Sequence, residues 1–127
     1  MQTMDDLRLA AAEAIRRVKA EVRWKPGKDV LHLQKRKAMG HLSANASLIE
    51  YNALILSVIQ DSQGHVFAYR LGMQPYVAVR SNVAGRPWLA MFSLAGIMET
   101  AFPPEDIEAY LAQPGFTGIG TVEEVLA

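Results

Sequence analysis

The stretch "HLQKRKAMGH", residues 32–41, concentrates side chains that can move protons and hold anions. His32 and His41 enclose the cations Lys35, Arg36 and Lys37. An imidazole, with an ordinary pKa of about 6.5, can accept or donate a proton near neutral pH. Lysine and arginine bind phosphate oxygens. This combination of residue types predicts proton transfer beside a bound phosphate.

Metal-independent cleavage of RNA is the reaction that needs histidines and cations and nothing else. A base takes the proton of the 2′-hydroxyl, cations stabilise the charged phosphorane, and an acid protonates the leaving oxygen. We expect His32 and His41 to exchange these protons. The phosphate would be held by cations chosen from Lys35, Arg36, Arg70 and Arg80. The alternative is that each histidine is structural or lies on the surface, which is the commoner situation for an isolated histidine.

Other chemistries lack the residues they need. The chain has no cysteine, which excludes disulfides, thiolate metal sites and cysteine nucleophiles. The two histidines are not spaced i, i+4, and no acid lies between Asp29 and Glu50 to complete a set of metal ligands. No glycine-rich phosphate loop, serine elbow or paired-carboxylate motif is present. We therefore expect neither a metal nor another cofactor.

Helical patterns flank the histidine stretch. Residues 4–23 carry apolar residues at spacings of three and four, and Thr3 with Asp6 forms a capping box at the start. A second helix should start near Asn45 or Ser47, where Ser47 and Glu50 form a capping box, and run to about Gln60. Its apolar character on most sides predicts burial against a sheet. The "VLH" that leads into His32 suits either a short strand or the start of a helix.

From His65 the apolar period changes to two, in "HVFAYRL", "YVAVRS", "WLAMFSL" and "IMETAF". Short connections predict antiparallel neighbours, and Gly96 marks either a turn or a bulge, so the sheet should have three or four strands. "PPEDIEAYLA" predicts a short helix, and so do residues 121–126, where Thr121 and Glu124 form a capping box. The expected fold is one α+β domain over residues 1–127: two N-terminal helices, a three- to four-stranded antiparallel sheet, then short C-terminal helices. The helices should cover one face and leave the other open.

Charge is segregated along a chain whose net charge is zero. Ten of the 13 Lys and Arg residues lie between Arg8 and Lys37, and six carboxylates follow from Glu99 onward. A basic surface can hold phosphates, although solvated helix faces produce the same segregation.

Residues 30–104 contain "H-x-x-K-R-x-x-x-G-H-L", the helical "EYNALI", the strand "YVAVR" and "T-A-F-P-P". This arrangement resembles the superfamily of small nucleases that groups barnase, EndoU, the colicin E5 and D nucleases and RelE, with phage and toxin C-terminal domains among them. The resemblance implies two helices followed by a four-stranded antiparallel sheet. It also implies an RNA site lined by His32, Lys35, His41, Arg80 and Thr100. The usual Lys-His dipeptide is replaced here by "QKR" and "GHL".

A second hypothesis is a non-enzymatic binding or assembly protein. Apolar sheet residues would then line an adaptable pocket or an interface: Met73, Tyr76, Trp88, Met91, Phe92 and Met98. Half-hydrophobic composition with zero net charge predicts a homodimer. No apolar run reaches the length of a membrane span, and the acidic N-terminus is unlike a signal peptide, so we expect a cytoplasmic protein.

Overall fold

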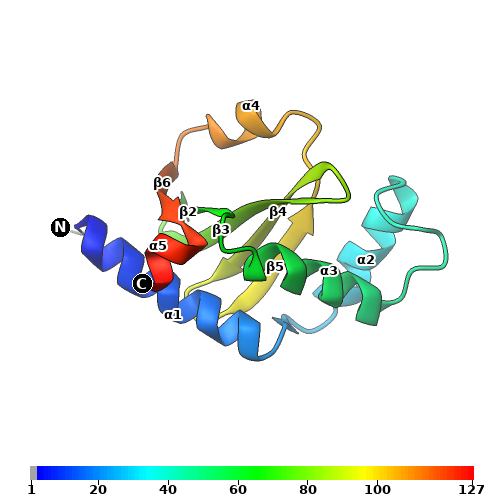
Figure 1. Ribbon diagram of the computed structural model, residues 1–127. Helices are drawn as coiled ribbons and strands as arrows, with labels where there is room; N and C mark the ends of the chain where they lie inside the picture. The colour runs from blue at the N-terminus through cyan, green and yellow to red at the C-terminus, as the bar shows by residue number, and fades with distance from the viewer. Residues whose placement is uncertain (1–2) are drawn as a thin grey trace.

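The computed structural model describes residues 3–127 and has an α+β fold built on a single sheet (Figure 1). Six strands lie in the order β1-β5-β4-β3-β2-β6. The elements are α1 (Met4–Ala20), β1 (Arg23–Trp24), α2 (Lys28–Ala38), α3 (Leu48–Gln60), β2 (His65–Leu71), β3 (Gln74–Val83), β4 (Arg86–Ser93), β5 (Ile97–Phe102), α4 (Ile107–Leu111), β6 (Phe116–Thr121) and α5 (Val122–Leu126). Within the described residues, no helix is long and apolar enough to cross a bilayer.

The four strands with period-two patterns form the predicted antiparallel meander, β2 to β5. The prediction of three or four strands was incomplete, because β1 and β6 extend the sheet at its two edges. β1 pairs parallel to β5, which makes the sheet mixed. Two residues are too few to show a period, and β6 contains Gly118 and Gly120, which weaken a strand signal. Both edge strands are therefore products of tertiary pairing.

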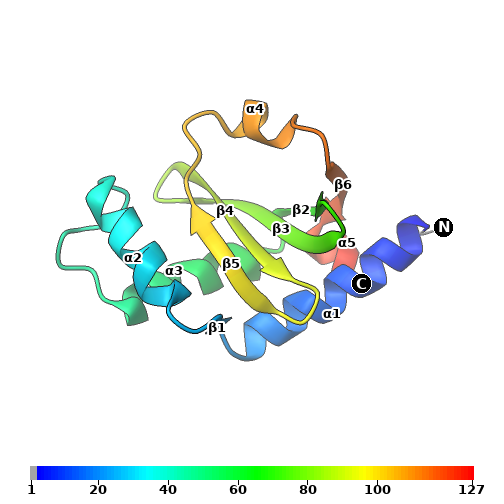
Figure 2. The same ribbon diagram turned by 180° about the vertical axis from the view of Figure 1, so that it is seen from behind.

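Helices lie on both faces of the sheet, which corrects the expectation of one open face. α1 and α3 cover one face, and α4 lies on the opposite side (Figures 1 and 2). The main core joins α1 and α3 to inward residues of the sheet, such as Val77, Ala90 and Phe92. On the other face, Tyr110 and Leu111 of the α4 segment pack against a smaller buried cluster of Ala78, Leu89 and Met91.

The helix boundaries follow local capping with one main exception. Capping boxes begin α1 at Thr3 and α5 at Thr121, and Ser47 accepts a hydrogen bond from the Glu50 amide at the start of α3. The first helix was predicted to reach residue 23, but α1 ends at Ala20 because the chain extends to pair as β1. The ambiguous segment after Gly27 is a helix, α2, of 11 residues.

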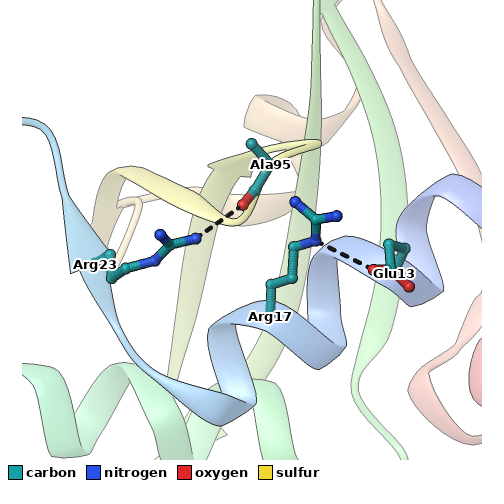
Figure 3. A network of polar contacts seen from close by, with 4 residues as sticks. All are labelled: Glu13, Arg17, Arg23 and Ala95. Atoms are coloured by element: carbon teal, nitrogen blue, oxygen red, sulfur yellow. Dashed lines mark hydrogen bonds and ion pairs between the residues drawn. The ribbon is translucent and has the colours of Figure 1, made fainter.

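The turn between β4 and β5 is fixed against α1. Gly96 has a φ of 80° there, so β4 and β5 are separate strands rather than one bulged strand. A Cβ added at Gly96 would lie 2.6 Å from Cβ of Arg17 on α1. Arg17 pairs with Glu13, and Arg23 of β1 donates a hydrogen bond to the Ala95 carbonyl (Figure 3). These contacts hold β1 and the start of β5 in place, and both elements lead into the candidate site.

Candidate functional site

One face of α2 carries four basic or titratable side chains. Lys28, His32, Lys35 and Arg36 are spaced i, i+4, i+7 and i+8, which places them on the same side of a helix. Asp29 in the first turn and three cations in the last turn both complement the helix dipole. α2 lies against β5, so this basic face meets the sheet edge.

The basic face of α2 and the end of β5 enclose a groove of about 320 Å³, called here the His32 groove. Its lining residues are Lys28, His32, Lys35, Arg36, Glu99, Thr100 and Phe102. The His32 Nδ1 lies 3.3 Å from the Thr100 Oγ1, within hydrogen-bonding distance. A register shift in β5 pairs Met98 with Phe92 and Thr100 with Met91, which leaves Glu99 as an extra, bulged residue. Bulges of this kind re-aim side chains near functional sites.

Trp24 orients the imidazole of His32. Its indole stacks on that ring, with centroids 5.6 Å apart and an interplanar angle of 27°. The indole Nε1 donates a hydrogen bond of 2.9 Å to Oδ1 of Asn52 on α3. The ring of His32 therefore contacts both Trp24 of β1 and Thr100 of β5, and these two strands pair in parallel.

Arg36 is a buried cation that has no carboxylate partner among residues 3–127. Only 5% of its surface is exposed, and its Nε has no hydrogen-bond acceptor. Its Nη1 lies 3.1 Å from the His41 Nδ1, its Nη2 contacts the Met39 sulfur at 3.8 Å, and its guanidinium lies 5.6 Å from the centre of the Phe102 ring. Buried charges in proteins are normally paired. Arg36 thus carries unused capacity to bind an anion.

Both histidines of the stretch have lowered pKa values. Burial lowers the pKa of His32 most, Lys28, Lys35 and Arg36 lower it further, and Glu99 opposes them. Burial and then Arg36 and Arg86 lower the pKa of His41, against Glu105. Both rings are therefore neutral at pH 7, the form that can accept a proton or a hydrogen bond.

His41 does not line the His32 groove. It lies after the end of α2, edge-on to the buried Trp88 ring at a centroid distance of 6.4 Å. Because a guanidinium can only donate, the contact with Arg36 makes the Nδ1 of His41 an acceptor and leaves its proton on Nε2. The two predicted histidines therefore do not share one hollow: His32 lines the groove, and His41 contacts the Arg36 guanidinium without lining it.

The two strand arginines lie elsewhere and on opposite faces. Arg80 is on the same face of the sheet as Thr100. The register Arg80–Leu89–Phe102 places it on β3, two strands and about 10 Å away from β5. There it pairs with Glu108 of α4 at 2.6 Å and lines a separate polar hollow with Asp61 and His65. Arg70 borders a pocket between α1 and the sheet. The structure thus brings together His32, Lys35, Arg36 and Thr100, and leaves Arg70 and Arg80 outside.

Sequence reasoning missed Lys28, Trp24, Glu99 and Phe102 as parts of this site. Lys28 precedes His32 by one helical turn, so a helix prediction for residues 28–38 would have identified it. The other three depend on the parallel pairing of β1 with β5 and on the bulge in β5. Local sequence carries no comparable signal for those features.

The apolar residues of the second hypothesis are mostly core. Trp88, Met91, Phe92 and Met98 are buried, and Met73 is 87% exposed. Tyr76 does border a pocket of about 220 Å³, lined by residues of α1, β2 and β3 that include Leu7, Ala11 and Tyr69. This pocket is distinct from the His32 groove.

Within residues 3–127, no three His, Asp or Glu side chains converge in a group able to hold a metal ion. Comparisons with protein-family models, with curated proteins and with solved structures found no match to this chain. The resemblance to the small nucleases therefore stays a hypothesis.

Proposed function

We propose that this protein binds RNA in the His32 groove and cleaves it without a metal ion. The observation that carries the proposal is the buried, carboxylate-free guanidinium of Arg36, next to the hydrogen-bonded pair of His32 and Thr100. A buried cation costs free energy unless an anion or several acceptors compensate it. A phosphate bound in the groove would supply that compensation.

The charge of the groove favours a phosphate over a neutral ligand. Lys28 and Lys35 add two cations beside Arg36, and neither forms an ion pair with any described carboxylate. Glu99 is the one acid in the lining, and Lys25 pairs with it at 3.3 Å. The net positive charge would also stabilise the extra negative charge that develops on phosphorus in the transition state.

His32 is the group suited to take the proton of the 2′-hydroxyl. When Nδ1 carries a proton and donates it to Thr100, Nε2 presents a free lone pair. The 2′-oxygen then attacks phosphorus, the bond to the 5′-oxygen breaks, and solvent protonates that leaving oxygen. His41 is assigned to holding Arg36, because its Nδ1 is already an acceptor for that residue. The use of the 2′-hydroxyl as nucleophile makes the substrate RNA and not DNA.

The test is cleavage of single-stranded RNA by purified protein in EDTA. His32→Ala should lower the rate roughly a hundredfold, the scale of general base catalysis. The matched control is His65→Ala, because His65 is the third histidine of the chain and lies in a different hollow. Its rate should equal that of the unsubstituted protein.

Three results would contradict the proposal in different ways. Equal cleavage by the His32→Ala and unsubstituted proteins would indicate a contaminating nuclease. RNA binding without any cleavage would remove the catalytic part and retain the binding part. Absence of RNA binding as well would reject the function altogether.

The second candidate function is binding of a small apolar ligand. The observation in its favour is the pocket between α1 and the sheet, lined by Leu7, Ala11, Tyr69 and Tyr76. Its volume of about 220 Å³ suits one aromatic ring better than a drug-sized molecule.

We also retain the proposal of a homodimer, which light scattering at tens of micromolar, on the order of weak dimer affinities, would test.

A further inference from the structure

His41, which contacts the Arg36 guanidinium, and Arg86 are not among the residues that line the His32 groove. His41 bonds to the Arg36 guanidinium at 3.1 Å and contacts Trp88 edge-on. Arg86 lies two residues before Trp88 on β4, so both side chains leave the strand on the same side. Arg86 accordingly contributes to the electrostatic environment of His41.

Both groups are donors with no described acceptor. The bond from Arg36 fixes the proton of neutral His41 on Nε2, so this atom can only donate. Arg86 is exposed and forms no ion pair within the described residues. A neutral N–H donor beside a guanidinium is a suitable pair for a phosphate oxygen.

The backbone holds Arg86 in a defined place. Val83 pairs with Arg86 across a hairpin whose two loop residues, Ala84 and Gly85, have φ values of 51° and 79°. Positive φ at both positions is typical of the tight type I′ turn. It is uncommon for an alanine, and such strain recurs at functional sites.

We propose that His41 and Arg86 form a second phosphate subsite, adjoining the His32 groove across Arg36. The substrate class is then single-stranded RNA whose successive phosphates occupy the two subsites. This inference rests on the proposed function, since the first phosphate lies in the His32 groove. Glu105, which also acts on His41, opposes an anion here and limits the affinity of the second subsite.

Uridine oligomers with 2′-O-methyl groups test the inference, because they bind without being cleaved. A dinucleotide has one phosphate and fills only the groove, whereas a tetranucleotide reaches both subsites. The tetranucleotide should bind about tenfold more tightly than the dinucleotide, because one additional charge-assisted contact contributes roughly that factor to the affinity. Arg86→Gln should abolish this gain and leave dinucleotide binding within about twofold. Arg86→Gln should also reduce the slope of log affinity against log salt concentration for the tetranucleotide by about 0.7, because that is the slope expected from one phosphate contact on a single strand.

Two further variants separate charge from folding. Glu105→Gln removes an exposed acid and should tighten tetranucleotide binding roughly threefold, an effect opposite in sign to that of Arg86→Gln. Lys19→Gln, on the exposed side of α1, is the control for a change in net charge. It should change neither the dinucleotide affinity nor the tetranucleotide affinity. Circular dichroism establishes that each variant is folded.

The outcomes distinguish this inference from the proposed function. Equal affinities for the two oligomers, or a tetranucleotide gain that survives Arg86→Gln, would overturn the second subsite and leave the groove intact. Failure of both oligomers to bind would reject the proposed function, and the second subsite with it.

Discussion

The imidazole of His32 and the hydroxyl of Thr100 meet at 3.3 Å across 68 residues of chain. His32 lies in the middle of α2, and Thr100 lies near the C-terminal end of β5. The indole of Trp24, from β1, stacks on the face of the same imidazole ring. Three elements therefore converge to orient a single imidazole. Such convergence is typical of a side chain whose direction matters.

Thr100→Val should lower the rate of RNA cleavage tenfold or more, because the isosteric methyl cannot bond to the Nδ1 of His32. Thr100→Ser, which retains the hydroxyl, should recover most of the rate. The pH–rate profile of Thr100→Val distinguishes positioning from folding, since loss of the bond should move the inflection assigned to His32. An unchanged rate in Thr100→Val would remove Thr100 from the site.

Arg36→Met should abolish phosphate and RNA binding without loss of stability. The substitution removes a buried charge that has no carboxylate partner, so the free energy of unfolding should be equal or higher by about 1 kcal/mol. Urea denaturation with and without inorganic phosphate measures both effects, because phosphate should stabilise only the unsubstituted protein. A loss of several kcal/mol would instead make Arg36 a structural residue.

The pKa of His32 predicts how stability depends on pH. Because burial and neighbouring cations lower this pKa below its unfolded value of about 6.5, the folded protein binds fewer protons than the unfolded chain. The contribution is therefore fully present above about pH 6.5 and is lost as the pH falls below it. His32→Gln should lose less free energy of unfolding between about pH 7.5 and pH 5.5 than the unsubstituted protein.

His41→Gln should give a shift of the same sign, because the pKa of His41 is lowered too. The unfolding free energies can be measured by urea titration at each pH. A variant whose stability depends more steeply on acidification than that of the unsubstituted protein would contradict the direction of these pKa shifts.

Gly96→Ala should destabilise the fold by about 2–4 kcal/mol, because it combines positive φ with a steric clash. Its new Cβ would lie 2.6 Å from Cβ of Arg17. Gly72→Ala is the matched control, since Gly72 has a φ of 62° but no atom within 4 Å of an added Cβ. That variant should cost only about 1 kcal/mol. Equal costs in thermal or urea unfolding would show that the α1 contact is unimportant.

Much of the fold was predictable because the signals are local. Alternating apolar residues identified β2 to β5, and the capping residues Thr3, Ser47 and Thr121 identified three helix starts. These patterns depend on the periods of helix and strand and on contacts within one turn. The concentration of histidines and cations over residues 32–41 was likewise visible from residue types alone.

The arrangement of those groups was decided by tertiary structure. Whether His32 and His41 share a hollow depends on where α2 ends relative to the sheet, and the fold places His32 in the groove and His41 against the Arg36 guanidinium, outside the groove lining. The burial of Arg36 against Phe102 depends on packing between segments more than 60 residues apart, and the bulge at Glu99 depends on the register between β4 and β5. Local periodicity constrains only near neighbours along the chain, whereas these contacts follow from sheet register and helix docking. The sequence by itself therefore determined which chemical groups are available, and the fold alone decided which of them meet.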